Sequence, residues 1–109
     1  MNESDKRLLV ELKQRLSKDV ATHLKRLIVF GSRAKDIANE DSDLDVIALV
    51  DMKTPEIEKK MDDIIYDIMW DHDFKPIISL KIFSEFDYIN AINKGFSFYK
   101  HVEKEGVSL

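Results

Sequence analysis

The sequence predicts a small α/β protein of the α+β kind, in which helices pack on a mixed β-sheet. Two observations support this fold class. Three apolar segments of strand length occur at residues 24–30, 44–50 and 76–83. Segments with helical periodicity lie before, between and after them, so helices and strands alternate along the chain. With 109 residues and 44% hydrophobic composition, we expect a single domain over residues 1–109.

The first helix is expected over about residues 4–18. Ser4 has the side chain of an N-cap, and leucines recur after it at helical spacing. They are Leu8, Leu9, Leu12 and Leu16, while lysine, arginine and glutamate occupy the opposite side. The segment is therefore predicted to pack a leucine face against the rest of the protein.

The first two strands come next. LKRLIVF at residues 24–30 is a short apolar run that ends at Gly31, which predicts a strand buried on both faces. The polar residues 32–43 favour a short helical turn followed by a loop. LDVIALV at residues 44–50 predicts the second strand, in which Asp45 is the one charged residue. A charge within a buried strand needs a partner or a role.

Capping residues mark the elements of the second half of the chain. Thr54 and Pro55 begin a long helix that continues to the polar WDHDF segment. A third strand is expected from Pro76 to Ser84, where SEFD has the spacing of a capping box for the next helix. A last amphipathic stretch ends at Gly106. The apolar stripe of the long helix consists of Ile57, Met61, Ile64, Ile65 and Ile68.

Composition excludes several kinds of site and partner. The chain has no cysteine, so any metal must be bound by oxygen or histidine ligands. His23, His72 and His101 are far apart in the sequence, which predicts surface or packing roles and no zinc site. The net charge is −4 and no block of lysine or arginine occurs, which disfavours nucleic acid as the main partner.

The N-terminal segment bears on localisation. MNESDKRLLVELKQRL interrupts its apolar positions with charges throughout. This pattern fits neither the apolar centre of a signal peptide nor a membrane span. We therefore expect a cytoplasmic protein with no membrane partner.

One short constellation carries most of the chemical information. Gly31-Ser32 stands at the end of the first strand, and Asp43-Leu44-Asp45 begins the second after ten intervening residues. Gly31 lets the backbone turn sharply and approach a triphosphate, while Ser32 and the amides after it can donate to phosphate oxygens at a helix N-terminus. Asp43 and Asp45, two apart on a strand, direct their carboxylates to the same face. Such hard anionic oxygens suit Mg²⁺.

The two aspartates have two interpretations. An isolated Asp-x-Asp would favour residues that merely cap and solvate a strand end. In the other interpretation they share a divalent cation, which removes the repulsion between the two carboxylates. The Gly-Ser turn upstream favours the metal. The bound metal would neutralise the charge that develops on the α-phosphorus and the pyrophosphate. A second metal would lower the pKa of an incoming hydroxyl.

IVFGSRAKDIANEDSDLDVIALV resembles the signature of the minimal nucleotidyltransferase (MNT) family, within the polymerase-beta-like nucleotidyltransferase superfamily. The shared features, in order, are a strand, Gly-Ser, Arg-Ala, a variable loop, Ser-Asp-x-Asp and a strand. The resemblance implies a nucleotidyltransferase-like fold with Gly31 and Ser32 on the nucleotide phosphates and Arg33 along the triphosphate path. It also implies that Asp43 and Asp45 are the catalytic metal ligands.

Two residues or groups of residues depart from the pattern of that family. Asp36 stands where relatives frequently have glycine, and it adds negative charge near a phosphate site. Catalytic members usually carry a third carboxylate on the following strand, but the third strand here offers Ser79 and Lys81, so the usual general base is missing. Asp71 and Asp73 precede that strand, where acidic residues are typical of a solvated helix end, and we do not assign them to the site.

The resemblance implies an Mg²⁺-dependent enzyme that moves a nucleoside monophosphate, AMP from ATP, to a hydroxyl acceptor. Short relatives are commonly paired with HEPN-domain proteins and act as antitoxins that attach AMP to a tyrosine of the HEPN toxin. Because the third carboxylate is missing, the alternative is a non-catalytic module that binds nucleotide or a partner protein. A third interpretation is a structural domain that keeps the fold without a ligand.

Aromatic residues near the C-terminus also have two interpretations. Phe96, Phe98 and Tyr99 can stack on a nucleotide base, or they can complete a core or a subunit contact. Their spacing favours packing. Exposed aromatic side chains on so small a domain are also compatible with a homodimer.

Overall fold

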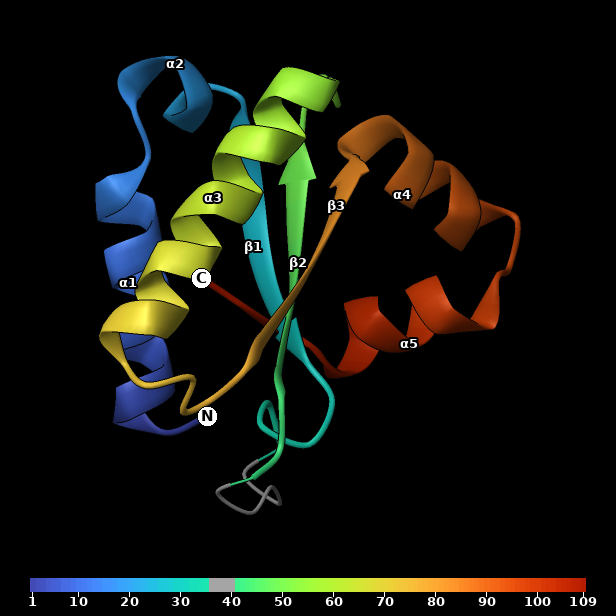
Figure 1. Cartoon of the computed structure of the whole chain (residues 1–109). Coiled ribbons are helices and arrows are strands. Elements are labelled where there is room, and N and C mark those ends of the chain that lie inside the picture. Colours follow the sequence, from blue (N-terminus) through green and yellow to red (C-terminus); the bar gives the residue numbers. More distant parts are fainter. Residues whose placement is uncertain (36–40) are drawn as a thin grey trace.

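The computed structural model of the 109-residue chain describes residues 1–35 and 41–109. Apart from the short helix expected after the first strand and two short elements that were not predicted, its described helices and strands follow the predicted order. Together they form a mixed sheet with packed helices, so the predicted fold class is confirmed. In chain order they are α1 (Glu3–Arg15), α2 (Lys18–Ala21), β1 (Leu24–Phe30), β2 (Leu44–Val50), α3 (Pro55–Asp71), β3 (Ile78–Ser84), α4 (Glu85–Asn93), α5 (Ser97–Glu105) and β4 (Val107–Ser108) (Figure 1).

The sheet has the strand order β3-β2-β1-β4. β1 is antiparallel to both β2 and β4, whereas β2 is parallel to β3 and is joined to it by the crossover helix α3. The register pairs Asp45 with Phe30 on one side and with Ser79 on the other. These three residues therefore lie in one row across the sheet.

Helices cover both faces of the sheet. Figure 1 shows α1 and α3 on one side and α4 and α5 on the other. Alternate residues of β1 enter different cores, because Leu27 and Val29 pack with α1 and α3 whereas Ile28 packs with Tyr88 and Val102 of α4 and α5. The prediction of two-sided burial is therefore confirmed for the inner part of β1, and β2 is divided between the two cores in the same way.

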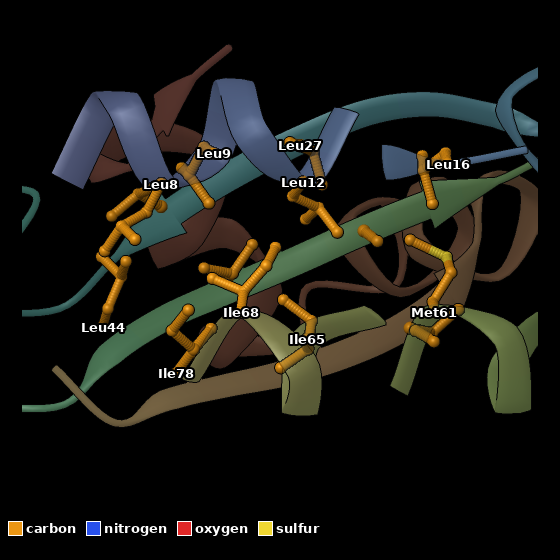
Figure 2. Packing of buried hydrophobic residues seen from close by; sticks show 14 of the residues in the cluster. Leu8, Leu9, Leu12, Leu16, Leu27, Leu44, Met61, Ile65, Ile68 and Ile78 are labelled. Carbon is orange, nitrogen blue, oxygen red and sulfur yellow. The ribbon is translucent and has the colours of Figure 1, made fainter. Parts of the chain in front are cut away.

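The larger core lies between the sheet and the α1–α3 pair. Figure 2 shows leucines of α1 on one side of this cluster and isoleucines of α3 on the other, with side chains of the strands beside them. The predicted stripe of α3 is confirmed, with Ile64 partly buried and the other four residues buried. The predicted caps are also confirmed: the Thr54 hydroxyl accepts the Ile57 amide at 3.2 Å, and the Ser84 hydroxyl accepts the Asp87 amide at 3.1 Å.

The predicted limits of two elements were wrong. α1 begins at Glu3 because Asn2, not Ser4, is its N-cap, and the Asn2 side chain accepts the Asp5 amide at 2.7 Å. The helix ends at Arg15 instead of near residue 18. The third strand begins at Ile78, and Pro76 belongs to the turn before it, since proline has no amide hydrogen for a sheet ladder.

Two elements were not predicted. α2 has four residues and β4 has two, so neither is long enough for a hydrophobic period to identify it. β4 nevertheless ties the C-terminal segment to β1, because its residues pair with Ile28 and Val29. In the parts of the chain described, no helix has both the length and the apolar character that a membrane crossing requires.

Candidate functional site

The turn after β1 brings a glycine against an acid of β2. Gly31 has a φ of +76°, in the region where residues with a side chain are strained. A Cβ added to Gly31 would lie 2.9 Å from Oδ2 of Asp45. The backbone conformation therefore favours glycine, a side chain there would have to displace the Asp45 carboxylate, and the two halves of the motif lie side by side.

Residues 32–35 continue from this glycine as a turn, in which the Lys35 amide donates to the Ser32 carbonyl at 3.2 Å. Ser32 itself is half-buried. The expected short helix is not found among the residues described here, so Ser32 begins a turn rather than a helix in that part of the chain. Asp36, where relatives have glycine, lies outside the described residues.

Asp43 and Asp45, which we call the aspartate pair, lie at the start of β2. Asp43 immediately precedes the strand and is exposed, whereas Asp45 is its second residue and is half-buried. Burial raises the pKa of the Asp45 carboxyl, the negative charge of Asp43 raises it further, and Lys81 opposes the shift. The two carboxylates are thus close enough to interact. They lie at the same end of the inner strands as the glycine turn.

The aspartate pair has the chemistry of a divalent-cation site. Two carboxylates that repel each other supply hard oxygen ligands, and a bound cation would reverse the cost of ionising Asp45. Asp43 and Asp45 could therefore hold Mg²⁺. Among the residues that the structure describes, no group of three or more acids, histidines or cysteines gathers at one point, so within them the aspartate pair supplies two ligands.

The neighbouring strand has no acid beside Asp45. β3 places Ser79 opposite Asp45 and Lys81 opposite Ile47, and both side chains belong to the same face as Asp45. A hydroxyl and an ammonium group therefore stand where the third carboxylate was expected. Asp71 forms an ion pair with Arg15 of α1, which is consistent with the solvated helix end that the sequence suggested.

Arg33, which the resemblance placed along the triphosphate path, contacts Asp5 and Ser42 in this structure. Its side chain is only 9% exposed, and Nη1 lies 3.0 and 3.1 Å from the two carboxylate oxygens of Asp5 in α1. Its Nε donates to the Ser42 carbonyl at 2.7 Å. These atoms are engaged inside the protein, so the position of Arg33 lends no support to a phosphate contact and indicates a structural tie.

Asp5 is the residue near the site that sequence reasoning missed. It precedes Leu8, Leu9 and Leu12 by three, four and seven residues, which places it on the leucine face of α1. An acid on a buried face needs a buried cation, and this was the available signal. The signal did not name the partner, because Arg33 is 28 residues away along the chain.

The C-terminal aromatic residues pack against the end of the sheet near the site. The ring of Phe98 meets Phe30 edge to face at a centroid distance of 5.6 Å, and it meets Tyr99 at 5.2 Å. Phe30 is the register partner of Asp45. All three aromatic residues thus take part in ring contacts, since Phe96 also meets Tyr99 at 6.5 Å, although Phe96 and Phe98 stay 56% and 41% exposed.

Comparison with known proteins agrees with this geometry. A family model described as "Nucleotidyltransferase domain" matches residues 7–105, which include the glycine turn, the aspartate pair and β3. No curated protein matches the chain.

Proposed function

Since the chain belongs to the nucleotidyltransferase domain family, in the polymerase-beta-like superfamily, we propose that it is an Mg²⁺-dependent enzyme that transfers AMP from ATP to a hydroxyl acceptor. The observation that carries the proposal is the approach of the glycine turn to Asp45. The Asp45 carboxylate lies 2.9 Å from where a Gly31 side chain would begin, with Asp43 beside it. A phosphate-binding turn and a pair of metal ligands therefore share one point.

Each residue of the site has a part in this reaction. Gly31 leaves room for a triphosphate to approach the backbone, and the Ser32 hydroxyl with the amides of the turn donates to phosphate oxygens. Asp43 and Asp45 would hold Mg²⁺, which when bound neutralises charge on the phosphates. The acceptor oxygen forms a bond to the α-phosphorus, and the bond from that phosphorus to pyrophosphate breaks.

The missing third carboxylate bears on the acceptor. Ser79 and Lys81 occupy the β3 positions beside the aspartate pair, so no carboxylate of β3 can take the proton of the acceptor hydroxyl. A phenol has a pKa of about 10 and loses its proton far more readily than an aliphatic alcohol. A tyrosine acceptor therefore suits this site better than a sugar or serine hydroxyl.

A tyrosine acceptor agrees with the HEPN-domain partner that the resemblance implied. We propose that the chain is a minimal nucleotidyltransferase and acts as an antitoxin that attaches AMP to a tyrosine of a HEPN-domain toxin. The alternative, favoured by the same absence of an acid from β3, is a non-catalytic module that binds Mg²⁺ and nucleotide and regulates a partner by contact alone.

The two functions are separated by a labelling experiment. The protein is incubated with Mg²⁺, ATP labelled at the α-phosphate and the HEPN protein encoded beside it, and label on the partner is measured. Transfer by the wild type and by Asp63→Asn, an exposed change on α3, but not by Asp43→Asn, supports the enzyme. Binding of Mg²⁺-ATP without transfer supports the regulatory module, and the absence of both overturns the proposal.

A further inference from the structure

Two charged residues are buried among those that the structure describes. Asp5 is 1% exposed and Arg33 is 9% exposed. Burying a charge pair costs several kcal/mol of desolvation per ion, and such pairs are often no more stabilising than apolar residues of the same size. Because such an ion pair adds little stability and lies beside the candidate active site, its burial favours a positioning role.

The Arg33 side chain joins three separate segments of the chain. It comes from the turn after β1, its Nη1 donates to both carboxylate oxygens of Asp5 in α1, and its Nε donates to the Ser42 carbonyl before β2. The planar guanidinium fixes the directions of these donors relative to one another. Asp5 is anchored in turn, because its amide donates to the Asn2 cap and α1 is packed by its leucines.

The Ser42 carbonyl belongs to the same peptide unit as the Asp43 nitrogen. Because that unit is planar, holding the carbonyl oxygen also fixes the direction in which the chain enters Asp43. Asp45 has other support, since it pairs with Phe30 and Ser79 within the sheet. Asp43 lies outside β2 and is exposed, so it is the member of the aspartate pair that depends on its neighbours for position.

We propose that Arg33 is a positioning residue that sets the geometry of the metal site: through the Ser42 carbonyl it holds Asp43 beside Asp45, and through Asp5 it is braced against α1. The proposal rests on the proposed function, because it concerns the same site. It differs from the role that the resemblance implied, in which Arg33 contacts the triphosphate itself.

The test compares two arginines of similar construction. Arg33→Lys keeps a positive charge for Asp5, but a single ammonium group cannot reproduce the separate donors to Asp5 and Ser42. Arg26→Lys is the control, because Arg26 also donates from Nη1 to a carboxylate, Glu103, and from Nε to an oxygen, that of Ser108. Mg²⁺ is titrated at fixed ATP, and both the heat of binding and the melting temperature are recorded.

Arg33→Lys is expected to raise the Mg²⁺ concentration at half-saturation about 10-fold or more, the usual effect of losing a residue that orients a metal ligand. Arg26→Lys is expected to lower the melting temperature and leave the Mg²⁺ titration unchanged. If the Mg²⁺ midpoint simply follows the loss of melting temperature in both variants, Arg33 has a structural role only and the proposal is overturned.

A double variant removes the dependence on stability. Asp5→Leu with Arg33→Met replaces the ion pair by apolar side chains, which commonly preserves stability while removing the tie to Ser42. The expected result is a melting temperature near that of the wild type with a raised Mg²⁺ midpoint, and an unchanged midpoint overturns the proposal. A wild-type protein that takes up no Mg²⁺-ATP overturns the proposed function, whereas wild-type uptake with unaltered variants overturns the positioning role alone.

Discussion

The two ends of the β1–β2 pair are built in opposite ways. At the far end, where β1 begins and β2 ends, unlike charges meet: Lys25 lies 3.7 Å from Asp51, and Arg26 lies 2.9 Å from Glu103. At the site end the aspartate pair brings like charges together, and Lys81 only opposes the resulting rise in the pKa of Asp45. Arg33 is buried there and pairs with Asp5. Unlike charges therefore pair at the far end, whereas two like charges adjoin at the site end.

The arginines of the two ends show what this difference means. Arg26 is 32% exposed and joins β1 to α5 and to Ser108 of β4, so it closes the C-terminal part of the fold. Arg33 is buried and holds the segment that leads into β2. An arginine thus joins elements of the fold at one end, and on our proposal it positions the site at the other. The repulsion between Asp43 and Asp45 lowers stability at the end where a bound cation would remove it.

The largest expected effect is a loss of stability on breaking the two ion pairs, and it should be greater for the buried pair. Asp5→Ala removes the carboxylate that pairs with the buried Arg33 guanidinium, and we expect the free energy of unfolding to fall by about 3–5 kcal/mol. Glu103→Ala leaves a half-exposed arginine and removes the acceptor of the buried Tyr88 hydroxyl, and we expect a loss of about 1–3 kcal/mol. Urea unfolding measures both, and equal losses would contradict the contrast.

Two glycines of positive φ give the next effect. Gly31→Ala and Gly95→Ala both place a side chain in the left-handed region, which costs about 1–2 kcal/mol. Only at Gly31 does the new Cβ meet the Asp45 carboxylate, since nothing lies within 4 Å of a Cβ at Gly95. Gly31→Ala is therefore expected to weaken Mg²⁺-ATP binding about 10-fold, measured by calorimetry, whereas Gly95→Ala lowers stability alone. Equal binding by both variants would contradict the proposed site.

A smaller effect, a gain in Mg²⁺ affinity, is expected from adding an acid at the site end. Ser79 is the β3 partner of Asp45, so Ser79→Asp places a third carboxylate next to the aspartate pair. We expect Mg²⁺ to bind a few-fold more tightly and, if the protein is an enzyme, AMP transfer to rise. Ser79→Asn has the same size without the charge and serves as control. An Mg²⁺ affinity no higher than that of the control would show that β3 does not face the metal.

The smallest effects have opposite signs at the two ends of β2. Burial and Asp43 raise the pKa of Asp45 above 3.8, so its ionisation costs stability as pH rises from the unfolded value through the folded one. The His23 hydrogen bond lowers the pKa of Asp51, so Asp51 adds stability at neutral pH that is lost as pH falls through its folded pKa.

In EDTA at pH 7, Asp45→Asn should therefore raise the melting temperature by a few degrees and Asp51→Asn should lower it, and both differences should shrink toward pH 3. Mg²⁺ should stabilise the wild type and leave Asp45→Asn unchanged, and this stabilisation should decline on acidification from a pH above the ordinary aspartate range. Thermal melts across pH, with and without Mg²⁺, measure both effects. A shift of the same sign at Asp45 and Asp51 would remove the contrast.

Much of the fold could be predicted because local signals agreed. The apolar runs gave β1 and β2 their limits, and Thr54 and Ser84 marked the starts of α3 and α4 through side-chain caps that the structure contains. The start of α1 was wrong because Asn2 and Ser4 are both good caps two residues apart. In the structure the Asn2 side chain makes the capping hydrogen bond, to the Asp5 amide.

The candidate site was predicted in part, and the reason lies in side-chain length. Gly31 and the aspartate pair could be brought together from the sequence, since a glycine has no side chain to place and strand alternation directs short carboxylates. A motif gives the place of Arg33 in the sequence, but it does not give the direction of a long side chain with several rotatable bonds. That direction depends on Asp5, a residue on another element with no part in the motif.

The brace on Arg33 begins outside the matched family region, which starts at residue 7. Asp5 and its cap Asn2 both precede that boundary. A trimmed protein expressed from residue 7 onward would keep every recognised motif residue and still lose the counterion that α1 supplies. Likewise, if Arg33 positions Asp43 as proposed, a fusion tag or a binding protein that unwinds the first turn of α1 would alter the position of Asp43 without contacting it.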